Sequence, residues 1–252
     1  MYLLYYVLIL LYGLLLGSFF NVAGLRIPAG ESIVKPRSHC PKCGHTLGAL
    51  ELIPVLSYVF QGGKCRQCKA GISPFYPIIE LTTGLLFLFA ALMMGWTGEL
   101  VVALTLISLC VIVFVSDYTY MIIPDKVLLF FLPLFIVERI FIPLTPWWDS
   151  LLGAAVGFGL LLLIAVVSKG GMGGGDVKLY GVLGIVLGFK FVLLSLFLAV
   201  FFGAFFGGIG MLFGKVKKGK AIPFGPYICL AVLITYFYGE RILEWYFQLF
   251  II

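Results

Sequence analysis

The chain has 252 residues, of which 62% are hydrophobic and 11% are charged, and its mean hydropathy is +1.16. Soluble domains are roughly half apolar and about a quarter charged, so this composition excludes them and indicates a multi-pass membrane protein. The formal net charge of +6 favours contact with anionic lipid headgroups over nucleic acid, because the basic residues are not interleaved with aromatic ones.

The apolar segments predict an all-α polytopic fold of about eight transmembrane helices, if each crossing takes about 20 residues. We place these helices at residues 2–24, 76–95, 99–116, 126–143, 150–168, 177–194, 195–214 and 225–247. The first segment has no basic region and no small-residue cleavage site, so we expect a retained helix and not a signal peptide. The expected parts are a first transmembrane helix at 1–24, a polar insert at 25–75 and a membrane core at 76–252.

Lys and Arg are divided unequally between the two predicted faces of the membrane. Fourteen of the seventeen fall in the insert or in loops on its side of the membrane. Basic loops are characteristic of the cytoplasmic side, so we expect a cytoplasmic insert and an external N-terminus.

The insert contains two C-x-x-C pairs, formed by Cys40, Cys43, Cys65 and Cys68. Four thiolates at this spacing make a closed tetrahedral site of the kind that holds structural zinc. Disulfides are the first alternative, but they are rare in the reducing cytosol, and a redox motif would need a βαβ context. Free thiols are the other alternative. His39 and His45 flank the first pair, and we interpret both as loop side chains rather than ligands.

Four acidic residues fall near the cytoplasmic ends of predicted helices: Glu80, Asp117, Asp125 and Asp176. A carboxylate inside a membrane costs about 2.5–3.5 kcal/mol even on the insertion scale, so each one needs a reason. Asp125 follows a proline at a helix start, where we expect it to cap the helix. Asp117 and Asp176 stand at similar depth on separate helices, which suggests a dyad sharing one proton. One member would activate water while the other protonates the peptide, and no Ser–His pair or H-E-x-x-H motif competes.

Asp176 closes the stretch KGGMGGGD at residues 169–176. Capping of the next helix would explain the aspartate but not the five glycines, which suit positive φ or close approach of another chain. A phosphate-binding loop would end in G-K-[ST] and supply a cation, whereas this stretch supplies a carboxylate. We therefore expect an extended peptide to pass close to Asp176.

These motifs make the chain resemble the bacterial type IV prepilin peptidases along nearly its whole length. The matching stretches are the two cysteine pairs, GSFFNVAGLRIP, GISPFYPIIELTTG, SDYTYMIIPD, GGGDVKL and IPFGPYI. The family is similar to presenilin-type proteases in its G-x-G-D aspartate, which here is GGGD at 173–176. The resemblance implies that Asp117 and Asp176 are the catalytic pair of an aspartyl endopeptidase in the bacterial inner membrane.

The resemblance also implies the substrates, which are type IV prepilins or pseudopilins. Cleavage after a glycine at the cytoplasmic face would be followed by methylation of the new N-terminal residue, usually phenylalanine, from S-adenosylmethionine. No Rossmann-like glycine motif cradles that cofactor, so its site would be built from the insert and nearby helix ends. Glu80 is a candidate for binding an ammonium group or the sulfonium, or alternatively for pairing with a basic insert residue. Gly63 and Lys64, beside the second cysteine pair, are further cofactor-binding candidates.

Three alternatives remain at this point. The first is a protease without methyltransferase activity, the second is a transporter, and the third is a non-proteolytic membrane protein with a zinc-binding pair of C-x-x-C motifs. A transporter would predict inverted repeats, and the two halves show no convincing self-similarity. A non-catalytic protein would leave the glycine stretch at 169–176 unexplained.

Overall fold

The computed structural model describes residues 2–168, 171–212 and 223–250. Its helices, in chain order, are α1 (Tyr2–Arg26), the 3₁₀ turn η1 (Ala49–Leu52), α2 (Leu56–Phe60), α3 (Phe75–Met94), α4 (Gly98–Tyr120), α5 (Asp125–Phe141), α6 (Asp149–Val167), α7 (Gly174–Leu212) and α8 (Gly225–Phe250). The only β structure in these ranges is two isolated bridges within the insert. The predicted all-α fold is confirmed.

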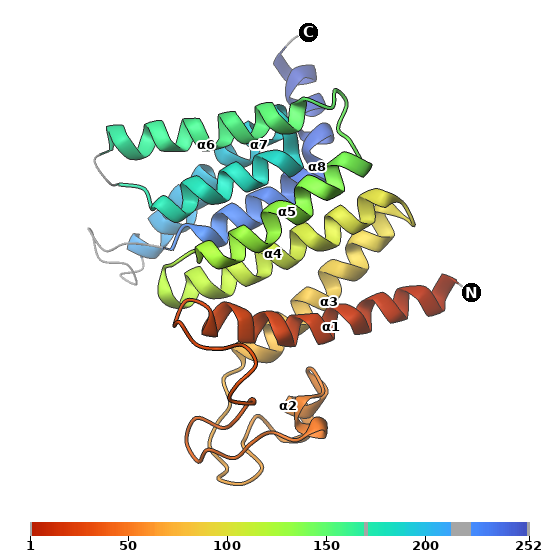
Figure 1. Ribbon diagram of the computed structural model, residues 1–252, viewed down its shortest axis with the longest axis vertical. Coiled ribbons are helices and arrows are strands. Elements are labelled where there is room, and N and C mark those ends of the chain that lie inside the picture. Colours follow the sequence, from red (N-terminus) through yellow and green to blue (C-terminus); the bar gives the residue numbers. More distant parts are fainter. Residues whose placement is uncertain (1, 169–170, 213–222, 251–252) are drawn as a thin grey trace. The chain divides into compact units, whose positions relative to one another are not determined.

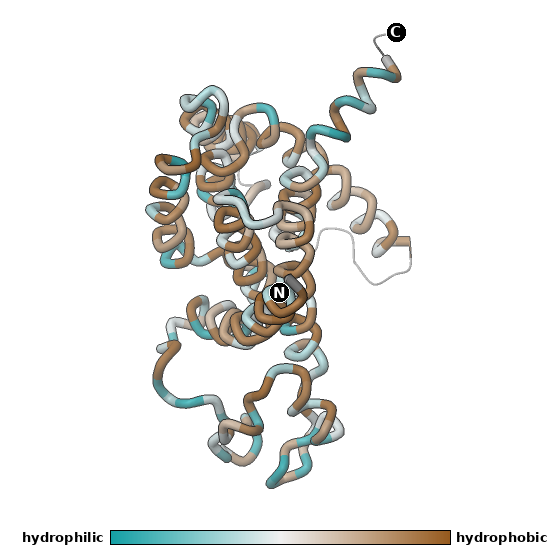
Figure 2. The backbone as a smooth tube through the Cα atoms, turned by 90° about the vertical axis from the view of Figure 1, so that its right-hand side faces the viewer, coloured by the Kyte–Doolittle hydropathy of each residue, from teal (hydrophilic) through white to brown (hydrophobic). Residues whose placement is uncertain are grey.

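In the described part of the chain, six helices are long and apolar enough to cross a membrane: α1, α3, α4, α6, α7 and α8. Apolar residues dominate them along their length, whereas the insert carries most of its polar residues in loops (Figure 2). The chain is therefore a multi-pass membrane protein. Five lysines used in the orientation argument lie outside the described residues: Lys169, Lys215, Lys217, Lys218 and Lys220.

The two other predicted segments, 126–143 and 195–214, are also helical: the first is α5, and the second, as far as residue 212, is the later part of α7. Helix α5 has 17 residues, and the 39-residue α7 is interrupted at Gly188, where φ is +75°. The break therefore falls at residue 188 and not between 194 and 195. Arg139 donates to the carbonyl of Val186 before the break (2.7 Å), and the N–H of Phe189 after it donates to Asp149 (3.2 Å). These side chains satisfy the helix ends that the interruption exposes.

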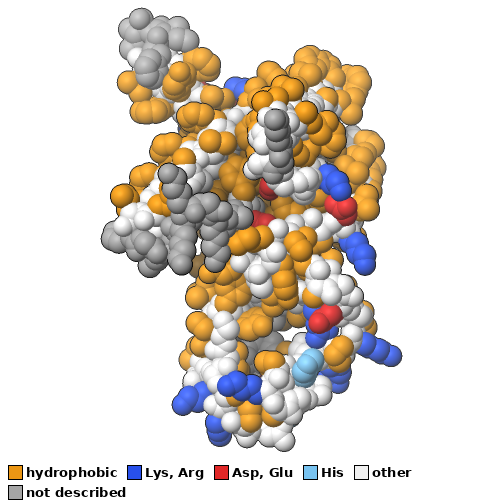
Figure 3. Space-filling view, turned by 90° about the vertical axis from the view of Figure 1, so that its left-hand side faces the viewer, with side chains coloured by type: hydrophobic (Ala, Val, Ile, Leu, Met, Phe, Trp, Pro, Cys, Tyr) orange, Lys and Arg blue, Asp and Glu red, His pale blue; other side chains and the backbone are white. Residues whose placement is uncertain are grey.

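The chain divides into two compact units, residues 1–115 and 116–252, and the boundary falls within α4. In the first unit α1 and α3 lie side by side (Figure 1). Their backbones come so close that a Cβ on Gly17 would lie 2.9 Å from the Cα of Glu80. The insert belongs to this unit, and its basic side chains gather at the bottom of Figure 3.

The second unit holds the end of α4 and all of α5 to α8. Within it α7 packs against α6 along much of its length and also contacts α8 and α5 (Figure 1). This central position of α7 explains why its first half is mostly buried, with Val177, Leu179, Tyr180 and Leu183 in the core. Helix α7 therefore fixes the position of its own first turn, which carries Asp176.

Candidate active site and metal centre

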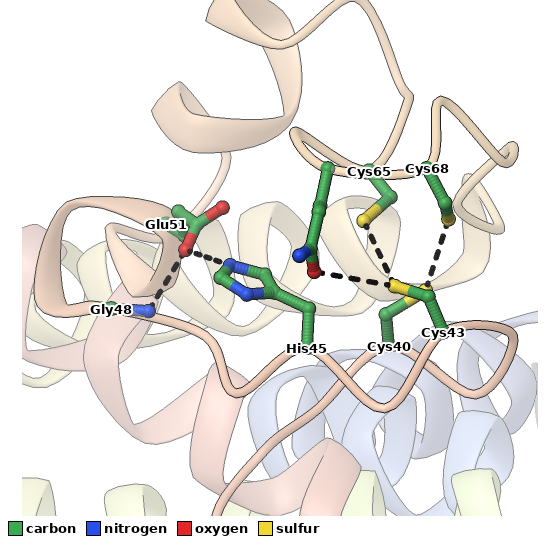
Figure 4. A network of polar contacts seen from close by, with 8 residues as sticks. Cys40, Cys43, His45, Gly48, Glu51, Cys65 and Cys68 are labelled. Carbon is green, nitrogen blue, oxygen red and sulfur yellow. Dashed lines mark hydrogen bonds and ion pairs between the residues drawn. The ribbon is translucent and has the colours of Figure 1, made fainter.

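The four cysteines of the insert converge on one point (Figure 4). The sulfurs of Cys40 and Cys68 are 3.8 Å apart, those of Cys43 and Cys65 are 3.9 Å apart, and all four lie within 4.8 Å of one another. A tetrahedral zinc site with bonds of about 2.3 Å has sulfur–sulfur edges of about 3.8 Å. The cluster therefore fits a tetrahedral metal ion, and the fourfold sulfur donor set is the one that zinc takes in structural sites.

Each cysteine pair sits in a short hairpin of the same design. The N–H of Cys40 donates to the carbonyl five residues later (2.9 Å), and the N–H of Cys65 does the same (2.8 Å). The fourth residue after each of these cysteines has positive φ, +71° at Gly44 and +58° at Lys69. The two knuckles are thus structural repeats, and the second places a lysine where the first has a glycine.

Backbone donors prepare the first thiol of each knuckle for metal binding. The N–H groups of Cys43 and Lys42 lower the pKa of Cys40 to about 6. The N–H groups of Cys68 and Gln67 likewise lower the pKa of Cys65. Both thiols are therefore biased toward the thiolate, which is the form that binds metal.

Neither histidine belongs to the sulfur cluster within the described residues. His45 Nε2 lies 3.1 Å from Glu51 Oε2, which also accepts the N–H of Gly48 (2.9 Å; Figure 4). The Gly48 N–H, followed by the imidazole, lowers the pKa of Glu51. His39 Nδ1 faces the carbonyl of Arg37 at 3.0 Å. His45 therefore links the first knuckle to η1, and both contacts favour structural roles.

Asp117 lies in the last turn of α4, because this helix continues to Tyr120 and does not end at 116 as expected. The side chain is 6% exposed, and its Oδ2 accepts a hydrogen bond from the N–H of Gly225 at 2.7 Å. A Cβ on Gly225 would lie 2.8 Å from that oxygen. Gly225 therefore both holds the carboxylate and makes room for it. Sequence reasoning missed this contact, although the segment IPFGPYI carried part of the family resemblance.

Asp176 lies in the first turn of α7, which begins at Gly174, so the aspartate is inside the helix and not at its N-cap. It is half-buried and close enough to Asp117 for the two charges to interact. The structure thus brings the two predicted residues together from α4 and α7. A Cβ on Gly175 would lie 2.9 Å from Ile123, whereas one on Gly174 would meet nothing within 4 Å. Close packing explains Gly175, and Gly174 faces open space.

The expected capping role of Asp125 is wrong. Pro124 is the N-cap of α5 and no side chain caps it, because Asp125 is already the first helical residue. Its carboxylate instead binds Lys178 through both oxygens, at 2.9 and 2.7 Å. Asp125 thus joins α5 to the first turns of α7, and both partners are exposed.

Glu80 lines a pocket of about 440 Å³ between α1, α3 and the insert. Its carboxylate accepts the backbone N–H of Val55 at 2.8 Å, a contact that pattern reasoning had not foreseen. Gly63 has φ +67°, and a Cβ there would lie 2.9 Å from the hydroxyl of Tyr58, which lines the same pocket. Lys64 lines a separate hollow of about 550 Å³ on the insert. The three cofactor-binding candidates are therefore not brought to one site: Glu80 faces the pocket, Gly63 touches it through Tyr58, and Lys64 lies elsewhere.

Comparisons with known proteins match both units. Residues 11–94 match the Bacterial Peptidase A24 N-terminal domain, and residues 104–208 match the Type IV leader peptidase family. A prepilin leader peptidase/N-methyltransferase of Bacillus subtilis (strain 168) is 44% identical over 242 residues, which cover 96% of this chain and 98% of the relative. The chain belongs to the type IV leader peptidase family.

Other relatives of the same description support this membership of the leader peptidase family. The protein from Pseudomonas aeruginosa is 33% identical over 95% of this chain and 92% of its own length. That from Aeromonas salmonicida (strain A449) is 33% identical over 96% of this chain and 94% of its own length. No solved structure matches the chain. The predicted resemblance to this family is confirmed.

Proposed function

We propose that this protein is a membrane aspartyl endopeptidase that removes the leader from type IV prepilins or pseudopilins and then methylates the new N-terminal residue. The single observation that carries the proposal is that Asp117 and Asp176 interact although their helices, α4 and α7, are far apart in sequence. The chain also belongs to a family of leader peptidases. The names of the relatives, which join peptidase and N-methyltransferase, support the second activity.

In the cleavage step the two aspartates take different roles. The N–H of Gly225 donates to Asp117, and such a donor interacts more strongly with a carboxylate than with a neutral carboxyl group. We therefore assign Asp117 as the base that takes a proton from the attacking water. Asp176 then carries the shared proton and gives it to the leaving amine. Gly174 beside it offers the open backbone along which an extended peptide could lie.

The metal centre is proposed as one structural zinc held by Cys40, Cys43, Cys65 and Cys68. Four sulfur ligands close the coordination shell, so the metal would order the insert and leave the chemistry to side chains. Because η1 and α2 lie within the insert and line the pocket with Leu52 and Tyr58, an ordered insert also shapes that pocket.

S-Adenosylmethionine, whose sulfonium supplies an electrophilic methyl group, is the proposed cofactor, and we place it at the 440 Å³ pocket. The pocket combines apolar side chains and two tyrosines with the Glu80 and Glu51 carboxylates and the basic Arg26 and Lys42, and a mainly apolar pocket with a few polar groups is typical of small-molecule sites. Glu80 would hold a cationic group there and accept a proton from the amine before methylation. Gly63 supports the pocket by leaving room for Tyr58. Lys64 remains a weaker candidate because it faces the other hollow.

The proposed location is the bacterial inner membrane, with the insert and the dyad at the cytoplasmic face. The basic residues of the insert support this orientation, and they would also contact anionic lipid headgroups. A protein partner other than the pilin substrate is not required by either step, and we propose no nucleic-acid partner.

The test is to incubate purified protein with a synthetic prepilin and S-adenosylmethionine, and to measure the masses of the products. The expected products are a leader ending in glycine and a mature chain heavier by one methyl group. Asp117→Asn and Asp176→Asn should each abolish cleavage while membrane insertion is retained. The matched control is Asp125→Asn, which removes an exposed ion pair worth less than about 1 kcal/mol and should still cleave. Full cleavage by either dyad variant would refute the assignment.

A further inference from the structure

Several polar residues besides Glu80 line the pocket in the first unit, and one of them is a buried amide with an unpaired group. Asn21, the single asparagine of the chain, lies near the end of α1 and lines this pocket. Its side chain is almost fully buried, since the residue is 2% exposed. A buried amide in a membrane protein is costly unless both of its ends find hydrogen-bond partners.

Only one end of the Asn21 amide has a partner within the described residues. Nδ2 donates to the carbonyl of Tyr76 at 3.2 Å, which fixes the orientation of the amide. The other end, Oδ1, is buried and has no hydrogen-bond donor among the described residues. An unpaired acceptor on a pocket wall points to a ligand that carries a hydrogen-bond donor.

Helix register places this acceptor beside Glu80. Gly17 on α1 packs against the Cα of Glu80 on α3, and Asn21 on α1 bonds to Tyr76 on α3. Both pairs of contacts are four residues apart on their own helices, so they are separated by one turn of about 5.4 Å. The side chains of Asn21 and Glu80 thus lie about one turn apart on the same pocket wall.

The two groups together define the chemistry of the ligand. Glu80 supplies negative charge, and its hydrogen bonds to the N–H of Val55 and to Ser18 leave capacity for further donors, because each carboxylate has about four acceptor positions. Asn21 Oδ1 lacks a hydrogen-bond donor, and a sulfonium centre cannot supply one. An ammonium group satisfies both residues, since it carries a positive charge and three N–H donors.

We propose that Asn21 and Glu80 form an ammonium-binding subsite in this pocket. The proposal rests on the proposed methyl transfer, because both of its reactants carry such a group. One source is the α-ammonium of S-adenosylmethionine, and the other is the N-terminus of the cleaved pilin. In this subsite Glu80 attracts the ammonium by its negative charge, and Asn21 Oδ1 orients the ammonium by accepting a hydrogen bond from it.

The experiment measures binding to the full-length, zinc-loaded protein without any turnover. The first pair of probes is S-adenosylhomocysteine and its analogue without the α-amino group. The second pair is a mature pilin peptide beginning with phenylalanine and the same peptide with a 3-phenylpropanoyl group in place of that residue. Calorimetry should show a preference of about tenfold to a hundredfold for the amine in one pair, as expected for a charge-assisted hydrogen bond. The pair that shows it identifies the source.

Variants then assign the preference to these residues. Asn21→Leu removes the amide at similar volume, and Glu80→Gln removes the charge while keeping an acceptor for Val55. Each should lose most of the preference while the protein retains its zinc, which shows that the insert is folded. The control Glu31→Gln removes an exposed carboxylate of the insert that does not line the pocket, and it should keep the preference.

Two outcomes overturn the subsite: equal binding within both probe pairs, or a preference that persists in both variants. Its failure is distinguishable from failure of the proposed function. A parent protein that methylates pilin but shows no amine preference refutes the subsite alone. A parent that shows the preference but transfers no methyl group refutes the methyltransferase and leaves the ammonium site standing.

Discussion

Gly225 offers the sharpest local test of the proposed catalytic dyad. In Gly225→Ala the new Cβ would lie 2.8 Å from both Cβ and Oδ2 of Asp117, a distance that real Cβ atoms essentially never show. The Asp117 carboxylate must turn away and lose the 2.7 Å hydrogen bond from the N–H of residue 225. A hydrogen bond to a charged group contributes about 1.5–3 kcal/mol, so kcat should fall about tenfold to a hundredfold.

The assay is the rate of cleavage of a synthetic prepilin at saturating concentration, followed by mass spectrometry. The matched control is Gly159→Ala in α6, where a Cβ would meet nothing within 4 Å and alanine favours the helix. Gly225→Ala should also lower thermal stability, because the new Cβ meets the Cβ of Asp117 as well as its carboxylate, so both variants are assayed well below the temperature at which either unfolds. Cleavage by Gly225→Ala at the parent rate would show that this contact does not position Asp117 for catalysis.

Four further outcomes are expected. Purified protein should contain one zinc per chain, and Cys68→Ser should release it while Cys229→Ala, in α8, keeps it; active, reduced protein without metal would contradict the zinc site. Lys69→Gly should slow the loss of zinc to a chelator, because a non-glycine residue at φ +58° costs about 1–2 kcal/mol; an unchanged rate would mean that the knuckle is not strained there. Gly174→Ala should weaken prepilin binding without lowering thermal stability, because its Cβ meets only open space within the protein; unchanged KM would remove the expected peptide path. Asp176→Asn should still methylate a pilin peptide that is already cut, and failure with a peptide shown to bind would mean that the two activities share one site.

Much of this fold could be predicted because its signals are local. Apolar runs of membrane length and paired C-x-x-C motifs specify helices and a sulfur cluster through short-range spacing alone. The residues at which the helices end or break were harder to predict from the sequence. Helix α4 continues past Asp117, and α7 breaks at Gly188 because Arg139 and Asp149 satisfy the exposed ends there. Those two partners lie some 40 to 50 residues away in sequence, so local pattern gives no hint of them.

Among the contacts around the candidate sites, some residues could likewise be predicted from the sequence and others could not. Asp117 and Asp176 stand out because a carboxylate in an apolar segment is expensive wherever it points. Asp125 also stands out, but its role depends on Lys178, and the capping expected from its position after Pro124 proved wrong. Other partners that explain the sites, such as Gly225 and Val55, bring only a backbone group. Residue chemistry therefore finds the charged members of a site and misses the backbone that holds them.

The division of the chain bears on why the two proposed activities can be separated. The dyad and Gly225 lie in residues 116–252, whereas the sulfur cluster and the pocket with Glu80 lie in residues 1–115. The two family matches, residues 11–94 and 104–208, follow nearly the same division. Each unit thus supplies the residues of one proposed site. A change such as Gly225→Ala alters a contact with Asp117, which lies in the same unit. Since no residue in either proposed site is drawn from the other unit, loss of one activity does not by itself remove the groups that the other requires.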